Sequence, residues 1–150
     1  MLKKACFVLL LPLASCAWNP VITPYAYGQK SPSSASETAT IWGMVDGKEM
    51  YFREIDGKSL PSRGGGGYPI SLSLLPGSYT VEIYFNNVDY RYAVVNLPIR
   101  VEAGHTYVVE HEISSDDTRV ILSLKDLGTT TKCNYDRYNQ LRGNAKLICQ

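Results

Sequence analysis

The chain contains 150 residues, and its 15 Lys and Arg residues nearly balance its 14 Asp and Glu residues, giving a formal net charge of +1 at pH 7. This length suits one domain with a substantial core. A nearly neutral chain lacks the broad positive field that attracts nucleic acids, so we expect no nucleic-acid partner. Eleven Tyr against three Phe is a lopsided choice of aromatic residues. Tyrosine suits half-buried sheet surfaces and binding faces with a wet edge.

The first residues have the pattern of an export signal. Lys3-Lys4 precedes an apolar run of nine residues from Ala5 to Leu13. That run is too short to cross a bilayer as a helix, which takes about 20 residues. It fits the apolar region of a secretory signal, and small residues then lead to Cys16.

Leu13-Ala14-Ser15-Cys16 resembles the lipobox of bacterial lipoproteins. The resemblance implies that residues 1–15 are a signal peptide removed by cleavage, and that Cys16 carries lipid on its thiol and usually on its new amino terminus. Two or more acyl chains hold a protein stably at a membrane. In enterobacterial members an Asp after the cysteine favours the inner membrane, so by resemblance Ala17 indicates the outer membrane, with the protein mainly facing the periplasm. An ordinary signal peptide with an unrelated cysteine is the alternative.

Residues 16–38 are predicted to be the lipidated cysteine and a flexible tether. This segment holds Pro20, Pro24 and Pro32 and the serine-rich stretch KSPSSASET. Chains with few apolar residues and many Ser and Pro do not bury enough surface to pack, so a solvated linker is the expected structure.

The chain has four cysteines. Cys6 leaves with the signal and Cys16 takes the lipid, so Cys133 and Cys149 remain with one possible pairing. Disulfides persist in the compartment that an export signal implies. We therefore predict a Cys133–Cys149 disulfide, which in the chain-entropy description contributes about 3 kcal/mol. A metal pair is the alternative, but no His lies nearby and the spacing fits no known zinc pattern, so we expect no metal and no cofactor.

Residues 39–128 alternate with the period of two that is typical of half-buried strands. Candidate strands cover residues 39–45, 49–55, 70–74, 79–85, 90–101, 105–113 and 118–124. Asp46-Gly47 and Asp56-Gly57 predict two-residue hairpins, and Pro76-Gly77 is expected to close a third hairpin. About seven short strands, with no helical period of comparable strength, predict an all-β fold: a small antiparallel β-sandwich with a disulfide-stapled C-terminal extension.

Side chains able to do chemistry are sparse. His105 is expected where a turn meets a strand. His111 shares a strand face with Tyr107 and Val109 and is expected to be half-buried, whereas Glu110 and Glu112 point to the opposite face and so form no metal site with it. Gly64–Gly67 lacks the Lys and Ser or Thr that a phosphate-binding loop requires and is interpreted as a connecting loop. We expect no catalytic residues, and the chain is predicted not to be an enzyme.

The stretch IDGKSL…YPISLSLLPGSYTVEIYF, Ile55 to Phe85, resembles a PEGA-like module. In that module a DGK strand is followed by a Pro-x-x-Leu strand, a Pro-Gly turn and a YTVEI strand. VEAGHTYVVEHEI, Val101 to Ile113, is similar to a strand of uncharacterised proteobacterial envelope lipoproteins that carry this module. The resemblance implies a small β-sandwich on the cell envelope, usually without catalytic residues. The chain departs from it at the glycine run and at the C-terminal tail.

Residues 129–150 form the predicted tail, which the disulfide closes. A short helix is expected from about Asp136 to Leu141, ended by Gly143. Tyr and Arg are frequent interface anchors, so we consider the basic and aromatic residues of the tail as possible partner-binding residues: Tyr135, Arg137, Tyr138, Arg142 and Lys146. The alternative is that the tail only caps an edge or open end of the sandwich.

These features together predict a noncatalytic cell-envelope lipoprotein that acts as a structural or protein-interaction module. Its partners would be the membrane, through Cys16, and an envelope protein or peptidoglycan. The tyrosine excess and the basic, aromatic tail favour an alternative, a glycan- or peptidoglycan-binding lipoprotein. An inhibitor of a hydrolase is a further alternative that no motif supports.

Overall fold

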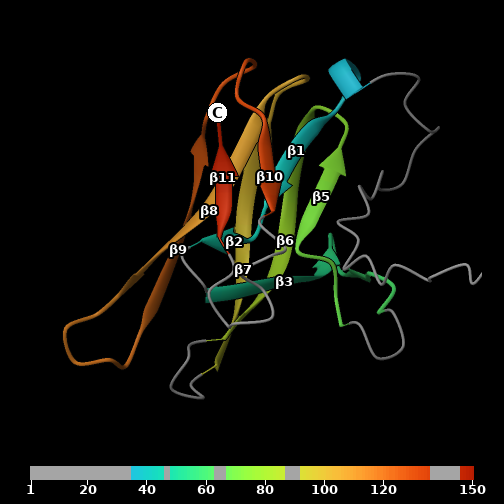
Figure 1. Cartoon of the computed structure of the whole chain (residues 1–150). Coiled ribbons are helices and arrows are strands. Elements are labelled where there is room, and N and C mark those ends of the chain that lie inside the picture. The colour runs from blue at the N-terminus through green and yellow to red at the C-terminus, as the bar shows by residue number, and fades with distance from the viewer. Residues whose placement is uncertain (1–34, 46–47, 63–66, 87–91, 136–145) are drawn as a thin grey trace, which may run out of the picture.

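The computed structural model describes residues 35–45, 48–62, 67–86, 92–135 and 146–150. A short 3₁₀ turn, η1 (Ala35–Glu37), precedes strands that form two main sheets and a small hairpin (Figure 1). The strands are β1 (Ala39–Trp42), β2 (Met44–Val45), β3 (Lys48–Ile55), β4 (Lys58–Ser59), β5 (Ser71–Leu74), β6 (Gly77–Asn86), β7 (Tyr92–Val101), β8 (Thr106–Ile113), β9 (Val120–Asp126), β10 (Cys133–Tyr135) and β11 (Leu147–Cys149).

The two main sheets enclose one hydrophobic core. The four-stranded sheet has the order β5-β1-β8-β9, and the five-stranded sheet has the order β2-β3-β6-β7 with β4 paired to β3. Buried side chains of both sheets pack together, among them Ile41, Leu72 and Val109 from the first and Phe52, Ile83 and Val101 from the second. The predicted all-β antiparallel sandwich is therefore confirmed. One strand pair, β1 with β8, is parallel.

The predicted strand over residues 39–45 is divided at Gly43, where the chain leaves one sheet for the other. β1 pairs with β5 and β8, whereas β2 pairs with β3. A Cβ atom at Gly43 would lie 2.5 Å from the carbonyl oxygen of Met50, and the Gly43 N–H donates to the Ile70 carbonyl at 2.8 Å. The corner therefore requires a residue without a side chain, as glycine in strands often signals.

The prediction of a hairpin at Pro76-Gly77 is wrong, because the strands on either side of this turn do not pair with each other. β5 pairs with β1 in the four-stranded sheet, whereas β6 pairs with β3 and β7 in the other sheet. The turn therefore carries the chain from one sheet to the other. Ser71 and Ser73, which alternate with leucines in this strand, are buried, so both faces of β5 are covered and not one, as in a half-buried strand. Strand alternation and turn residues identify extended segments, but the same pattern fits either connection.

The two Asp-Gly hairpins are present as predicted. Ile55 pairs with Lys58, and the intervening Asp56 and Gly57 have φ values of 50° and 73°, as the favoured two-residue hairpin turns require. Val45 pairs with Lys48; the two residues between them lie outside the described part of the chain. On β6, Val81, Ile83 and Phe85 are all in the core, in agreement with the alternation predicted over residues 79–85.

The last residues assigned to the tether contact the sandwich. Thr38 is 4% exposed, and its carbonyl accepts a hydrogen bond from the Gly104 N–H at 2.9 Å. Residues 1–34, which include Cys16 and most of the predicted signal and tether, lie outside the described residues. Within the residues described, no helix has the length and apolar character needed to span a membrane.

Candidate functional site: the two outer faces of the sandwich

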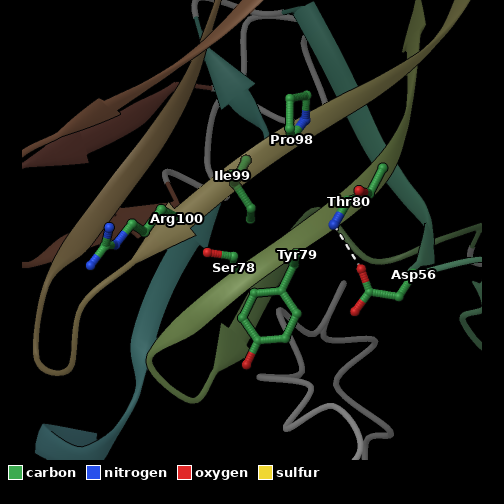
Figure 2. Close-up of a pocket in the computed structure, with 7 residues that line it drawn as sticks. All are labelled: Asp56, Ser78, Tyr79, Thr80, Pro98, Ile99 and Arg100. Atoms are coloured by element: carbon green, nitrogen blue, oxygen red, sulfur yellow. Dashed lines mark hydrogen bonds between the residues drawn. The ribbon is translucent and has the colours of Figure 1, made fainter.

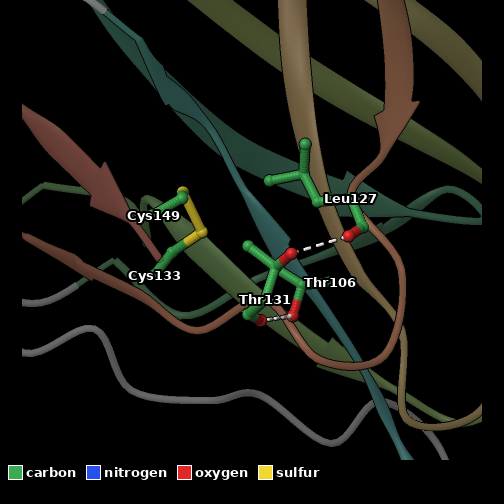
Figure 3. Close-up of a disulfide and its surroundings, with 5 residues drawn as sticks. All are labelled: Thr106, Leu127, Thr131, Cys133 and Cys149. Carbon is green, nitrogen blue, oxygen red and sulfur yellow. Dashed lines mark hydrogen bonds between the residues drawn. A yellow bond between two sulfur atoms is a disulfide. The ribbon is translucent and has the colours of Figure 1, made fainter.

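The C-terminal hairpin is closed by the predicted disulfide. Cys133 and Cys149 lie opposite each other in the antiparallel pair β10–β11, with Cα atoms 4.0 Å apart. Directly outside this pair, Lys132 and Gln150 exchange two backbone hydrogen bonds of 2.8 and 3.0 Å. The cysteines therefore occupy a non-hydrogen-bonded pair, the position where facing residues of an antiparallel ladder approach most closely. Figure 3 shows the disulfide beside the segment that joins β9 to β10.

This hairpin covers part of the outer face of the four-stranded sheet. Trp42 of β1 and Val108 of β8 are 6% and 7% exposed, and both point away from the main core. Cys133 and Leu147 of the hairpin pack against them, together with Leu127. Burial of both outer side chains indicates that the extension lies over a face of this sheet, whereas the capping interpretation had placed it at an edge or open end.

Two threonines hold the connecting segment in place (Figure 3). Thr106 Oγ1 donates to the carbonyl of Thr131 at 2.9 Å, and Thr131 Oγ1 donates to the carbonyl of Leu127 at 2.7 Å. The Thr106 carbonyl in turn accepts the Leu127 N–H at 2.8 Å. These bonds satisfy backbone groups beyond the end of β9.

Most of the predicted partner-binding residues of the tail lie outside the part of the chain that the structure describes. Arg137, Tyr138, Arg142 and the expected helix lie outside the described residues. Of Tyr135 the structure describes only the backbone, which pairs with Leu147. Lys146 is exposed. Their role in binding a partner stays a prediction.

The outer face of the five-stranded sheet carries a row of tyrosines, one from each of three adjacent strands. Tyr51 of β3 pairs in register with Tyr84 of β6, and their ring centroids are 6.4 Å apart. The Tyr84 and Tyr92 rings are 5.9 Å apart and only 19° from parallel. Tyr92 and Val94 of β7 are 71% and 46% exposed, and Val94 lies opposite Tyr84. We call Tyr51, Tyr84, Tyr92 and Val94 the tyrosine face.

A β-bulge places an arginine beside the tyrosine face. The register of β3 against β6 shifts between Phe52 and Glu54, so Arg53 is the extra residue. Bulges commonly redirect a side chain in this way. The Arg53 guanidinium lies 3.5 Å from a Glu82 carboxylate oxygen and 5.6 Å from the ring centroid of Tyr68. The positive charge of Arg53 is thus offset by Glu82 and by the π face of Tyr68.

β6 and β7 also line a surface hollow of about 430 Å³, shown in Figure 2. Asp56 closes one side: its Oδ1 accepts the Thr80 N–H at 2.8 Å, and its own N–H donates to the Thr80 carbonyl. The Tyr79 hydroxyl donates a hydrogen bond to the Leu75 carbonyl at 2.9 Å. Burial raises the pKa of Tyr79, and the negative charge of the nearby Asp56 carboxylate raises it further. The lining residues are Asp56, Ser78, Tyr79, Thr80, Pro98, Ile99 and Arg100.

His105 lies between two carboxylates at one end of the sandwich. Its Nδ1 is 2.9 and 3.1 Å from the two Asp126 oxygens, and its Nε2 is 3.8 Å from Glu102. The Tyr107 hydroxyl accepts the Glu102 N–H at 3.0 Å. Burial raises the pKa of Tyr107. The hydrogen bond from the Glu102 N–H lowers this pKa, and the negative charge of Asp126 raises it. These contacts tie the turn after β7 to the end of β9.

His111 is half-buried, and its ring centroid lies 5.1 Å from that of Phe85, a core residue. This agrees with the half-buried position predicted for His111. Glu110 lies on the opposite face, where Lys125 donates to it at 2.8 Å. No cluster of three or more potential metal-ligating side chains occurs within the described ranges.

No protein-family model, curated protein or solved structure matches this chain. The lipoprotein and PEGA-like resemblances therefore rest on the sequence motifs alone.

Proposed function

We propose that this chain is a lipid-anchored protein of the bacterial cell envelope that acts without catalysis, as an interaction module whose partner contacts the tyrosine face. In this proposal the lipid on Cys16 of the lipobox anchors the protein in the outer membrane, and the protein faces mainly the periplasm. The single observation that carries the interaction role is the exposed apolar surface of the tyrosine face. Tyr92 and Val94 stay 71% and 46% exposed there, and the Tyr84 ring stacks beside that of Tyr92.

The tyrosine face has the physical properties of an interface centre. Tyrosine is enriched among residues that dominate binding energy, because its large ring is apolar and its hydroxyl tolerates water. Contacts with Tyr84 restrict the Tyr92 side chain before any partner arrives. Less rotamer freedom is then lost on binding, which favours affinity.

The anchor is tested by fractionating cells that express wild-type protein, Cys16→Ala or Cys6→Ala. We expect wild type and Cys6→Ala in the membrane fraction, because Cys6 leaves with the signal peptide. Cys16→Ala should appear in the soluble periplasmic fraction, since it has no acyl chain to hold it. Continued membrane association of Cys16→Ala would refute the anchor.

The interaction role is tested by adding the purified Cys16→Ala protein back to isolated envelopes. Saturable binding is expected, and the further change Tyr92→Ala should weaken it. Ile121→Ala is the matched control, because Ile121 is an exposed apolar residue, 59% accessible, on β9 of the other sheet. Equal binding by the Tyr92 and Ile121 variants, or no saturable binding at all, would contradict the proposal.

A further inference from the structure

We infer that the tyrosine face and the hollow of β6 and β7 form one extended site for an uncharged glycan strand. This inference rests on the proposed function and names the chemical class of the partner. It concerns described residues of the sandwich and does not involve the C-terminal tail.

The two features belong to the same row of side chains. On β6, Val81, Ile83 and Phe85 point into the core, as does Tyr79, which lines the hollow from the core side. The residues that alternate with them, Ser78, Thr80, Glu82 and Tyr84, face outward. On β7 the residues opposite them are Val94, Asn96, Pro98 and Arg100. From Tyr84 to Ser78 the row extends six residues, or about 20 Å along the strand. A site of this length suits an extended polymer lying along the strands.

The chemistry of the row matches a sugar ring, which has apolar C–H faces and a rim of hydroxyl groups. Tyr84 and Tyr92 offer apolar ring surface at one end. Exposed hydroxyl and amide groups, from Ser78, Thr80 and Asn96, continue along the row. Each can both donate and accept hydrogen bonds, which suits the hydroxyls of a glycan.

The charges of the row favour an uncharged ligand. Arg53 lies 3.5 Å from Glu82, so these two charges already compensate each other beside the tyrosines. Recognition of a polyanion relies on several cations free to contact its charged groups. Arg100 stands at the opposite end of the row, in the hollow, where its guanidinium can donate to a hydroxyl or an acyl-amide oxygen.

The inference is tested by NMR titration of the mature Cys16→Ala chain with chitotetraose and, separately, with cellotetraose. We expect saturable shifts of the Tyr84, Tyr92 and Asn96 amides with at least one oligosaccharide. Tyr92→Ala should raise the dissociation constant about tenfold. Tyr92→Phe should keep the binding because it keeps the ring, and Ile121→Ala should bind as the parent does.

Absence of saturable shifts with both oligosaccharides would overturn the inference, as would unchanged affinity in Tyr92→Ala. If envelope binding depends on Tyr92 while neither oligosaccharide binds, the glycan inference fails and the proposed interaction role stands. Sedimentation analysis gives the remaining outcome. Self-association that Tyr92→Ala abolishes, without oligosaccharide binding, would assign the face to a second copy of the chain and overturn the inference.

Discussion

Replacing both Cys133 and Cys149 with Ser should destabilise the fold and uncover Trp42. The disulfide joins residues 16 apart in sequence. Without the cross-link the unfolded chain regains conformational entropy, which for a loop of this size lowers the free energy of unfolding by about 3 kcal/mol. A domain typically has a free energy of unfolding of about 5–15 kcal/mol, so the loss is a large share of the total.

The uncovering of Trp42 follows from what the hairpin touches. Cys133 and Leu147 pack on the cluster formed by Trp42 and Val108, in which Trp42 is 6% exposed. Without the cross-link the β10–β11 pair keeps its ladder bonds, but an isolated two-stranded hairpin is marginal in water. We therefore expect the hairpin to leave the sheet part of the time and admit water to the indole.

Denaturant unfolding measures the first effect, and tryptophan fluorescence with iodide quenching measures the second. The chain has two Trp residues, so both assays use a Trp18→Phe background in which Trp42 is the only indole. Leu147→Ala, with the disulfide intact, is the companion variant: it should increase quenching of Trp42 with a smaller loss of stability. If the double Ser variant unfolds with the parental free energy and shows unchanged quenching, the hairpin does not act as this cap.

Three further predictions concern the sandwich itself. Gly43→Ala should lower the free energy of unfolding by about 3 kcal/mol, because its Cβ would lie 2.5 Å from a backbone carbonyl oxygen. Hydrogen bonds from Ser114, and to a lesser extent from Thr118, lower the pKa of Asp116 from its usual 3.8. The turn after β8 should therefore be stabilised above about pH 3.8, and this stabilisation should be lost as the pH falls through the lower pKa of the folded state. Asp116→Asn should abolish the corresponding pH dependence of the Thr118 amide shift. Ser71→Ala should raise the free energy of unfolding by about 1 kcal/mol, since the buried Ser71 hydroxyl has no hydrogen-bond partner among the described residues.

The first two of these variants have a control in the same fold, and the third has a stated contrary outcome. Gly57→Ala introduces a side chain at a φ of +73° with nothing within 4 Å, so it should cost only about 1 kcal/mol; an equal loss in Gly43→Ala would refute the steric argument. Asp117→Asn should leave the acid dependence of the turn intact, and a loss of that dependence there would contradict the assignment to Asp116. A substantial loss of stability in Ser71→Ala would mean that the hydroxyl is satisfied in the folded protein.

The strands were predictable because burial on one face imposes alternation on the sequence. Val81, Ile83 and Phe85 are in the core where their spacing placed them. Strand partners were less accessible, because a turn such as Pro76-Gly77 has the same residues whether it closes a hairpin or crosses between sheets. The division at Gly43 depends on a close approach to Met50, a contact between strands that local patterning does not contain.

The candidate site was harder to predict than the disulfide. Counting cysteines left one pairing, and the structure has it. The tyrosine excess was visible in the composition, but Tyr51, Tyr84 and Tyr92 lie on three different strands and meet only through the pairing register. Three tyrosines at outward strand positions were the available signal.

Photo-crosslinking in living cells tests the central claim most directly. A photoreactive p-benzoylphenylalanine replaces Tyr92 on the tyrosine face in one strain and Ile121 on the other sheet in a second, with Cys16 intact in both. The account predicts a discrete crosslinked product, to an envelope protein or to glycan released by muramidase, at position 92 and none at position 121. A product at position 121 with none at position 92 would contradict the assignment of the tyrosine face as the binding surface.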